Sequence, residues 1–112
     1  MKIDRVAVYN KYGGKCAYCG RKIDYKDMQV DHIVPQARGG SDDMENLMPS
    51  CRLCNHYKRA NSLEGFRYAI RKIPKKLART SYIYRIGMAY GFYDDKDREI
   101  EFYFEKCEES EE

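Results

Sequence analysis

The stretch Asp31-His32-Ile33-Val34-Pro35 lies between two cysteine motifs of the same spacing, Cys16-Ala17-Tyr18-Cys19 and Cys51-Arg52-Leu53-Cys54. Two Cys-x-x-Cys pairs supply four thiolates to one tetrahedral zinc ion. Such a site holds a small fold together without an open coordination position for a reaction. The sequence therefore predicts a structural Zn²⁺ ion bound by Cys16, Cys19, Cys51 and Cys54. A redox-active cluster, or no metal at all, is the alternative for these four residues.

Asp31 and His32 have side chains that suit hydrolytic chemistry beside such a frame. A carboxylate offers the hard oxygen ligands that Mg²⁺ and Mn²⁺ prefer. An imidazole has an ordinary pKa near neutrality and can take a proton from water. A catalytic metal ion is therefore expected near this stretch, away from the four cysteines.

The size of the chain limits its core. Its 112 residues correspond to about one domain, and 35% of them are charged against 43% hydrophobic, so a bound metal would supplement a modest apolar core. We expect a single domain over residues 1–112. Its parts are a zinc-stapled core at 1–60, a helical and strand extension at 61–106, and an acidic tail at 107–112.

The sequence carries no signal for secretion or for a membrane. The start, Met1-Lys2-Ile3-Asp4-Arg5, is charged, and no stretch approaches the roughly 20 apolar residues of a membrane span. We expect an intracellular, cytoplasmic protein with no membrane partner. In a reducing compartment the paired cysteines are metal ligands rather than disulfides, and Cys107 is left over as an ordinary thiol.

Charge is distributed unevenly along the chain. Residues 1–80 hold 17 Lys and Arg against 8 Asp and Glu, whereas residues 81–112 hold 4 against 10. A basic body with an acidic end is typical of a nucleic-acid binder, because phosphate attraction supplies most non-specific affinity. The alternative is ordinary solvated surface charge.

The expected elements of the first half are short. Asp4 is a candidate N-cap for a helix that runs to about Tyr12. Gly20 follows the first cysteine pair and can take the positive φ that a metal-binding turn requires. Residues 28–34 alternate and carry β-branched side chains, which predicts a strand that ends at Pro35. Asp31 and His32 would then face opposite sides of this strand.

The second half continues the pattern. We expect a loop at 36–43, a second strand at 47–49, a helix from Cys51 to about residue 60, a helix at 63–77 that Pro74 kinks or ends, a helix at 84–90 and a terminal strand at 100–104. The helix after Cys51 presents Asn55 and Lys58, spaced i and i+3, on one face.

Taken together, these motifs resemble the HNH endonuclease family in its zinc-stapled form. The resemblance covers residues 13–60, with Asn46 placed 14 positions after His32 and Asn55 placed 9 after Asn46. The motifs that carry this resemblance are Cys16-x-x-Cys19-Gly20, Asp31-His32-Ile33-Val34-Pro35, Gly39-Gly40, Asn46-Leu47 and Cys51-x-x-Cys54-Asn55-x-x-Lys58. The C-terminal third also resembles small phage and bacterial HNH proteins.

The resemblance implies an α+β fold, a ββα-metal core with additional C-terminal helices and the terminal strand. It also implies a role for each matching residue. His32 is the general base, Asp31 and Asn55 bind a catalytic Mg²⁺ or Mn²⁺ ion, and Asn46 holds the loop and orients the histidine. The reaction implied is hydrolysis of DNA at one divalent ion, with 5′-phosphate and 3′-hydroxyl ends.

Each assignment has an alternative. The third named position of the family is often histidine, whereas this chain has Asn55 with His56 beside it, which leaves the preferred metal open. His32 as a structural residue, Asp31 paired with Arg38, and Asn46 and Asn55 in turn or cap positions are the competing interpretations. Contact with phosphate or simple solvation is open for Arg52, Lys58 and Arg59.

The function predicted is a metal-dependent DNA endonuclease. The main alternative is a non-catalytic zinc module that binds nucleic acid or a protein partner. A dithiol redox protein is a third possibility, but no βαβ pattern accompanies the Cys-x-x-Cys motifs. Nicking or double-strand cleavage, the target, and specificity through a homodimer or a protein partner are left open by the sequence.

Overall fold

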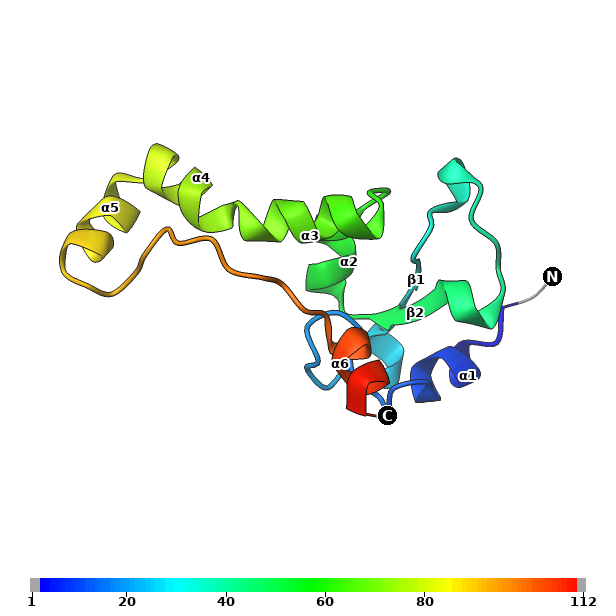
Figure 1. Ribbon diagram of the computed structural model, residues 1–112. Helices are drawn as coiled ribbons and strands as arrows, with labels where there is room; N and C mark the ends of the chain where they lie inside the picture. Colours follow the sequence, from blue (N-terminus) through cyan, green and yellow to red (C-terminus); the bar gives the residue numbers. More distant parts are fainter. Residues whose placement is uncertain (1–2, 111–112) are drawn as a thin grey trace. The chain divides into compact units, whose positions relative to one another are not determined.

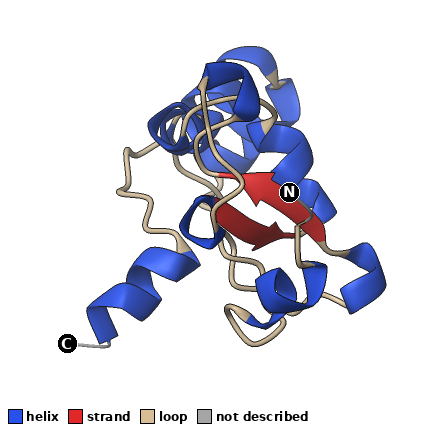
Figure 2. Cartoon of the chain, turned by 90° about the vertical axis from the view of Figure 1, so that its right-hand side faces the viewer, coloured by secondary structure: helices blue, strands red, loops and turns tan. Residues whose placement is uncertain are grey.

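The computed structural model describes residues 3–110, and its sheet is an antiparallel hairpin of β1 (Gln29–His32) and β2 (Leu47–Ser50). The register pairs Asp31 with Met48 and His32 with Leu47. Helix α2 (Arg52–Lys58) follows β2 and contacts β1 (Figures 1 and 2). This ββα arrangement confirms the predicted α+β fold class.

The chain divides into two compact units. The first unit comprises residues 1–63 and 101–112, and the second comprises residues 64–100. The predicted subdivision into core, extension and tail stays a prediction. Among the described residues, no helix is long and apolar enough to cross a membrane.

The other elements of the first unit surround the hairpin. They are α1 (Arg5–Asn10), α6 (Tyr103–Ser110) and three short 3₁₀ helices at Tyr25–Asp27, Gln36–Arg38 and Met44–Asn46. The predicted cap of α1 is confirmed, because the Asp4 side chain accepts a hydrogen bond of 3.1 Å from the Ala7 amide. Val8 of α1 is fully buried in a core with Met28 and Leu47 among its members.

The first cysteine motif is attached to the hairpin through its backbone. The Ala17 amide donates to the Pro49 carbonyl at 2.8 Å, and the Gly20 amide donates to the Cys16 carbonyl at 2.9 Å. Gly20 has φ +79°, the left-handed conformation predicted for this turn. The turn therefore lies directly beside β2.

The terminal strand predicted at residues 100–104 is wrong, because helix α6 begins there. The Glu105 side chain accepts a hydrogen bond of 2.8 Å from the Phe102 amide, which is a capping interaction for the first turn. The Tyr103 and Phe104 amides donate to Tyr18 and Ala17 at 3.0 and 2.8 Å. Phe102 and Phe104 are buried, so tertiary packing and a helix cap override β propensity. Helix α6 continues into the predicted tail as far as Ser110, and residues 111–112 lie outside the described residues.

The second unit is helical. Helix α3 (Leu63–Arg71) ends before Pro74, as predicted, and α4 (Ile73–Thr80) begins with this proline in its first turn, where the missing amide costs no hydrogen bond. Helix α5 (Tyr82–Ala89) begins two residues before the start predicted at residue 84. Pro74 thus divides the helix expected at 63–77 into two.

Candidate functional site

The four cysteines of the two motifs form one cluster. Their Sγ atoms all lie within 4.8 Å of one another, and the Cys19 and Cys51 sulfurs are 3.8 Å apart. Four Zn–S bonds of about 2.3 Å in a tetrahedron separate the sulfurs by about 3.8 Å. The sulfur positions therefore fit a structural zinc ion.

Hydrogen bonds surround this cluster. Arg21 donates from Nε to the Cys19 sulfur at 3.4 Å and from Nη2 to the Cys51 sulfur at 3.7 Å. A hydrogen bond from Cys54 lowers the pKa of Cys16 to about 4, whereas the same bond and burial raise the pKa of Cys54. Without a metal, one thiolate makes the next harder to form, and a bound cation removes this repulsion. The sequence analysis missed Arg21, whose only signal is a basic residue directly after the motif.

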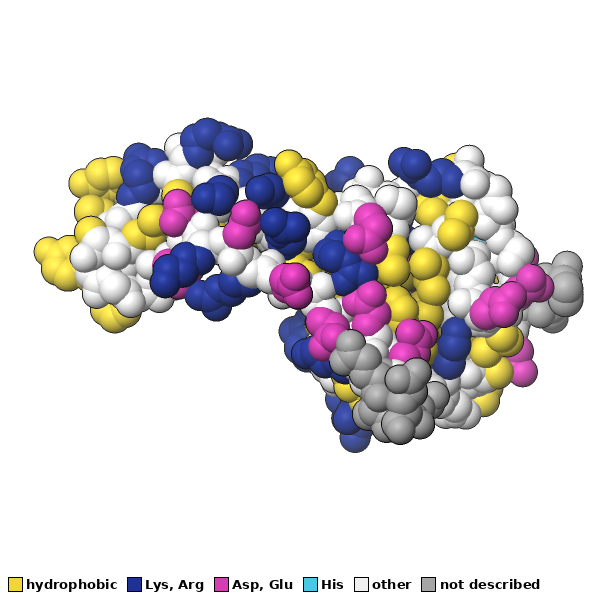
Figure 3. Space-filling model, in the orientation of Figure 1, with side chains coloured by type: hydrophobic (Ala, Val, Ile, Leu, Met, Phe, Trp, Pro, Cys, Tyr) yellow, Lys and Arg dark blue, Asp and Glu magenta, His cyan; other side chains and the backbone are white. Residues whose placement is uncertain are grey.

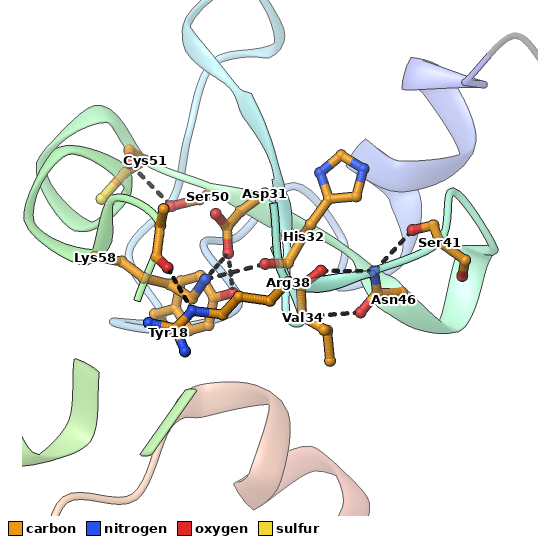
Figure 4. Close-up of polar contacts among 11 residues, drawn as sticks. Tyr18, Asp31, His32, Val34, Arg38, Ser41, Asn46, Ser50, Cys51 and Lys58 are labelled. Atoms are coloured by element: carbon orange, nitrogen blue, oxygen red, sulfur yellow. Dashed lines mark hydrogen bonds and ion pairs between the residues drawn. The ribbon is translucent and has the colours of Figure 1, made fainter. Parts of the chain in front are cut away.

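Asp31 is buried and has two partners on the same oxygen. Its Oδ2 accepts a hydrogen bond from the Tyr18 hydroxyl and lies 3.0 Å from the Lys58 Nζ (Figure 4). Burial, and then the charge of Asp31, raise the pKa of the Tyr18 phenol, so this phenol stays a donor. Oδ1 accepts no hydrogen bond from residues 3–110, which leaves it available as a ligand.

Lys58 is 0% exposed, although the sequence placed it among the residues for phosphate contact. Its ammonium also donates to the His32 carbonyl at 3.0 Å. The buried position does not match a surface role, because the charge of Asp31 and the hairpin backbone already engage the ammonium. Arg38 donates to the Ala60 carbonyl at 3.2 Å and is not the partner of Asp31.

His32 leaves the strand in a different direction from Asp31 (Figure 4). Its Nε2 lies 2.8 Å from Oδ1 of Asp42, which also accepts a hydrogen bond of 3.2 Å from the Gln36 side chain. The bond with His32 lowers the pKa of Asp42 below its ordinary value, so this carboxylate is ionised at neutral pH. An ionised acceptor here places the neutral ring's proton on Nε2 and the lone pair on Nδ1.

Asn46 ties together the loop that carries Asp42. Its Oδ1 accepts from the Val34 amide at 2.9 Å, and its Nδ2 donates to the Val34 and Ser41 carbonyls at 3.2 and 2.7 Å (Figure 4). Gly40 is needed beside this contact, because a Cβ there would lie 1.7 Å from the Val34 carbonyl oxygen. The local bonds are of the kind that the resemblance implies for Asn46, and they fix the residue directly before Asp42.

Two open pockets divide the predicted site residues. Asp31, His32 and Arg59 line a pocket of about 200 Å³. Asn55 lines a second pocket, of about 420 Å³, together with Arg52 and His56. The structure therefore brings the predicted base, one metal ligand and one cation to the same pocket, and Asn55 to another.

A second observation connects these pockets. Gln29 lines the pocket of Asn55 and lies two residues before Asp31, on the same face of β1. Asn55 likewise precedes Lys58 by three residues on α2, and Lys58 contacts Asp31. Asp31 and Asn55 thus lie on the faces through which β1 and α2 meet.

The part of the chain that holds both pockets is similar to known proteins. Residues 16–61 match the family model described as HNH endonuclease. The chain is 44% identical over 45 residues to "CRISPR-associated endonuclease Cas9" of Corynebacterium diphtheriae, and 44% identical over 57 residues to the protein of that name in Actinomyces naeslundii. These alignments cover 39% and 50% of this chain but only 4% and 5% of the two relatives.

The fold has a counterpart among solved structures. The crystal structure of the Type II-C Cas9 enzyme from Actinomyces naeslundii matches with a TM-score of 0.54 and 24% sequence identity. The match covers 83% of this chain and 11% of that protein. At this identity, the match supports the fold alone.

Proposed function

We propose that this protein is a metal-dependent DNA endonuclease, on the basis of the match between residues 16–61 and the HNH endonuclease family model. One observation carries the proposal. Asp31, His32 and Arg59 line one open pocket, so a metal ligand, a base and a phosphate-binding cation meet at one place. The relatives named above are endonucleases by name, which supports the same reaction class.

His32 acts as the general base in this proposal. Asp42 holds the proton of the neutral ring on Nε2 at 2.8 Å, so Nδ1 accepts the proton of the attacking water. Asp42 is a positioning residue, because it acts through the imidazole and not on the substrate. Asn46 supports Asp42 in turn through its bond to the Ser41 carbonyl.

Asp31 and Asn55 are the proposed ligands of one divalent ion. Carboxylate and amide oxygens suit Mg²⁺ or Mn²⁺, and Oδ1 of Asp31 accepts no hydrogen bond within residues 3–110. When bound, the ion neutralises charge on the phosphate and on the 3′-oxygen leaving group. The products are a 5′-phosphate and a 3′-hydroxyl end.

Arg52 and Arg59 are the proposed phosphate contacts. Both side chains are exposed, and each lines one of the two pockets. The proposed location of the protein is the cytoplasm. One active site cuts one strand, so a double-strand break would require a homodimer, a partner or a second encounter.

The test is nicking of supercoiled plasmid by the zinc-loaded protein with Mg²⁺, with Mn²⁺ and without either ion. The wild type should nick only with added metal, and His32→Ala should lower the rate by about 10²- to 10⁴-fold, the usual contribution of a general base. Product ends that DNA ligase reseals directly would identify 5′-phosphate and 3′-hydroxyl termini.

His56→Ala is the matched control, because His56 is the other histidine of the chain and is exposed on α2. Because His56 lines the pocket of Asn55, its loss should lower the rate far less than His32→Ala does. Full activity of His32→Ala, or loss of activity in His56→Ala alone, would overturn the assigned base. Circular dichroism and zinc content of each variant show whether the fold is intact.

The non-catalytic zinc module has one observation in its favour. Tyr18 and Lys58 satisfy Oδ2 of Asp31 inside the fold, as they would for a purely structural carboxylate. Under this alternative, His32→Ala leaves nucleic-acid binding and all other activity intact, and no divalent ion supports cleavage. Titration of Mn²⁺, followed by its electron paramagnetic resonance signal, also separates the two functions. Mn²⁺ binding that is lost in Asp31→Asn would support the nuclease and not the zinc module.

A further inference from the structure

The α4–α5 corner of the second unit is a preorganised turn between two helices. Ser81 ends α4 and caps α5, where its Oγ accepts from the Tyr84 amide at 3.1 Å. Arg85 donates to the Ala78 and Arg79 carbonyls at 2.9 and 3.3 Å, which satisfies the end of α4. These bonds fix the angle between the two helices.

One face of α5 packs inside the second unit. The Tyr84 ring stacks on Tyr93 with centroids 4.9 Å apart, and its hydroxyl donates to the Asp94 carbonyl at 2.9 Å. Gly87 allows this packing, because a Cβ there would lie 2.4 Å from the Tyr93 ring. Tyr84 and Gly87 therefore belong to the side of α5 that packs inside the unit.

Large exposed aromatic side chains stand at the two ends of α5. Tyr82 is 68% exposed, Tyr90 is 75% exposed and Phe92 is 80% exposed. Tyr82 begins the helix, and Tyr90 and Phe92 follow its last residue, Ala89. Hydrophobic side chains gather over α5 and Lys and Arg side chains over α4 (Figure 3). Exposed apolar area of this kind marks a binding surface.

The basic residues of α4 remain available for binding. Residues 63–89 hold seven Lys and Arg but one acidic residue, Glu64. Lys75, Lys76 and Arg79 are exposed and make no ion pair within the described part of the chain. The nearby carboxylates are engaged elsewhere, in the pairs Asp94–Arg98 at 2.7 Å, Asp97–Arg71 at 3.4 Å and Asp97–Lys72 at 3.7 Å.

We propose that the α4–α5 corner binds a single-stranded segment of nucleic acid. Lys75, Lys76 and Arg79 contact phosphates, and the bases stack on Tyr82, Tyr90 and Phe92. Cations that follow the backbone, together with exposed rings that accept any base, are the chemistry by which proteins bind single strands. A fully paired duplex presents its phosphates but not its base faces, so it uses only half of this surface.

The inference rests on the proposed function and refines its substrate to DNA with an unpaired segment. It is tested in the full chain carrying His32→Ala, so that the probe is not cut. Fluorescence anisotropy measures binding of a labelled single-stranded oligonucleotide and of the same sequence as a duplex, across a series of salt concentrations. We expect at least tenfold tighter binding of the single strand.

Two variants separate charge from stacking. Lys75→Ala/Lys76→Ala/Arg79→Ala should weaken single-strand binding at least tenfold and lower the slope of log affinity against log salt by about 2, since each phosphate contact contributes about 0.7. The matched control, Arg71→Ala/Lys72→Ala/Arg98→Ala, removes the same charge from the acid-paired residues and should stay within about twofold of the parent. Tyr82→Ala/Tyr90→Ala/Phe92→Ala should remove the preference for the single strand and leave duplex binding unchanged.

Three results would overturn the inference. The first is an equal effect of the charge variant and its control, and the second is a single-strand preference that survives loss of the three rings. The third is unchanged binding of DNA by the ring variant with a shift from dimer to monomer in sedimentation, which would assign the surface to a second copy of the chain. Plasmid nicking by the wild type, measured in parallel, reports separately on the proposed nuclease.

Discussion

The cysteine cluster and the Asp31–His32 pocket belong to the same unit, but they differ in how many of their polar atoms have partners within the protein. The four sulfurs face one another within 4.8 Å, and Arg21 donates to two of them from outside. In the pocket, by contrast, the protein holds one oxygen of Asp31 and one nitrogen of His32, and within residues 3–110 the second oxygen of Asp31 accepts no hydrogen bond. A closed polar set stabilises a fold, whereas this half-held set is what the proposed chemistry would use.

Loss of the closed set should have the largest effect. Cys51→Ser removes one ligand, and a structural zinc ion contributes about 10–16 kcal/mol to small zinc domains. The first unit should unfold, with loss of the zinc signal and of the part of the helical circular dichroism signal that comes from α1, α2 and α6. Cys107→Ser is the control, because Cys107 lies on α6 outside the cluster, and it should keep both signals. A folded, zinc-free Cys51→Ser variant would remove the contrast between the two sets.

Lys58→Met tests the buried ion pair between Lys58 and Oδ2 of Asp31. A carboxylate that loses its buried cation is left uncompensated, which costs about 3–5 kcal/mol of unfolding free energy in such pairs. Urea denaturation of the zinc-loaded protein measures this loss. The double variant Asp31→Asn/Lys58→Met should recover most of it, since neither charge remains buried. No recovery in the double variant would show that Lys58 stabilises the hairpin mainly through the His32 carbonyl.

Asp42→Ala tests the contact between Asp42 and Nε2 of His32. Partners that orient a reactive imidazole are commonly worth about 10- to 100-fold, and the loss should fall on kcat with KM unchanged. Asp42→Asn keeps an acceptor oxygen for Nε2 and should recover part of the rate. Because the pKa of Asp42 is lowered, the bond with His32 should persist as pH falls until it passes this lowered value. Equal kcat in all three proteins would show that the contact does not position the base.

The four cysteines could be predicted from their spacing, and the sequence also indicated Asp31 and His32, whereas Asp42, the partner of His32, could not be predicted. Two Cys-x-x-Cys pairs specify their own geometry, and the caps and strands around them follow local rules that the Asp4 bond and the β1–β2 pairing obey. Asp42 is ten residues from His32 in a loop whose path depends on Gly40 and Asn46. Only the three-dimensional path of that loop brings the carboxylate to the ring.

Lys58 and residues 100–104 show two further limits of the sequence. Lysine is almost never fully buried unless it is paired, and no pattern in the sequence announces a partner 27 positions away. The aromatic run at 102–104 has strand composition, but Glu105 caps a helix there and both phenylalanines are buried. In both cases a tertiary contact outweighs the local preference.

Glu105→Ala should give the smallest effect and sharpen the contrast between the two sets. Helix α6 is attached to the cysteine cluster, because the Tyr103 and Phe104 amides donate to the carbonyls of residues 18 and 17 within the first cysteine motif. Loss of the capping bond to the Phe102 amide should cost about 1 kcal/mol of unfolding free energy, the usual value of a helix cap. Glu105→Gln keeps an acceptor oxygen and should retain most of this stability. The nicking rate should stay close to the wild-type value in both variants, since the Tyr103 amide still bonds to Tyr18, the partner of Asp31. A fall in kcat with unchanged stability would mean that the closed side also adjusts the chemistry, and the division between the two sets would not hold.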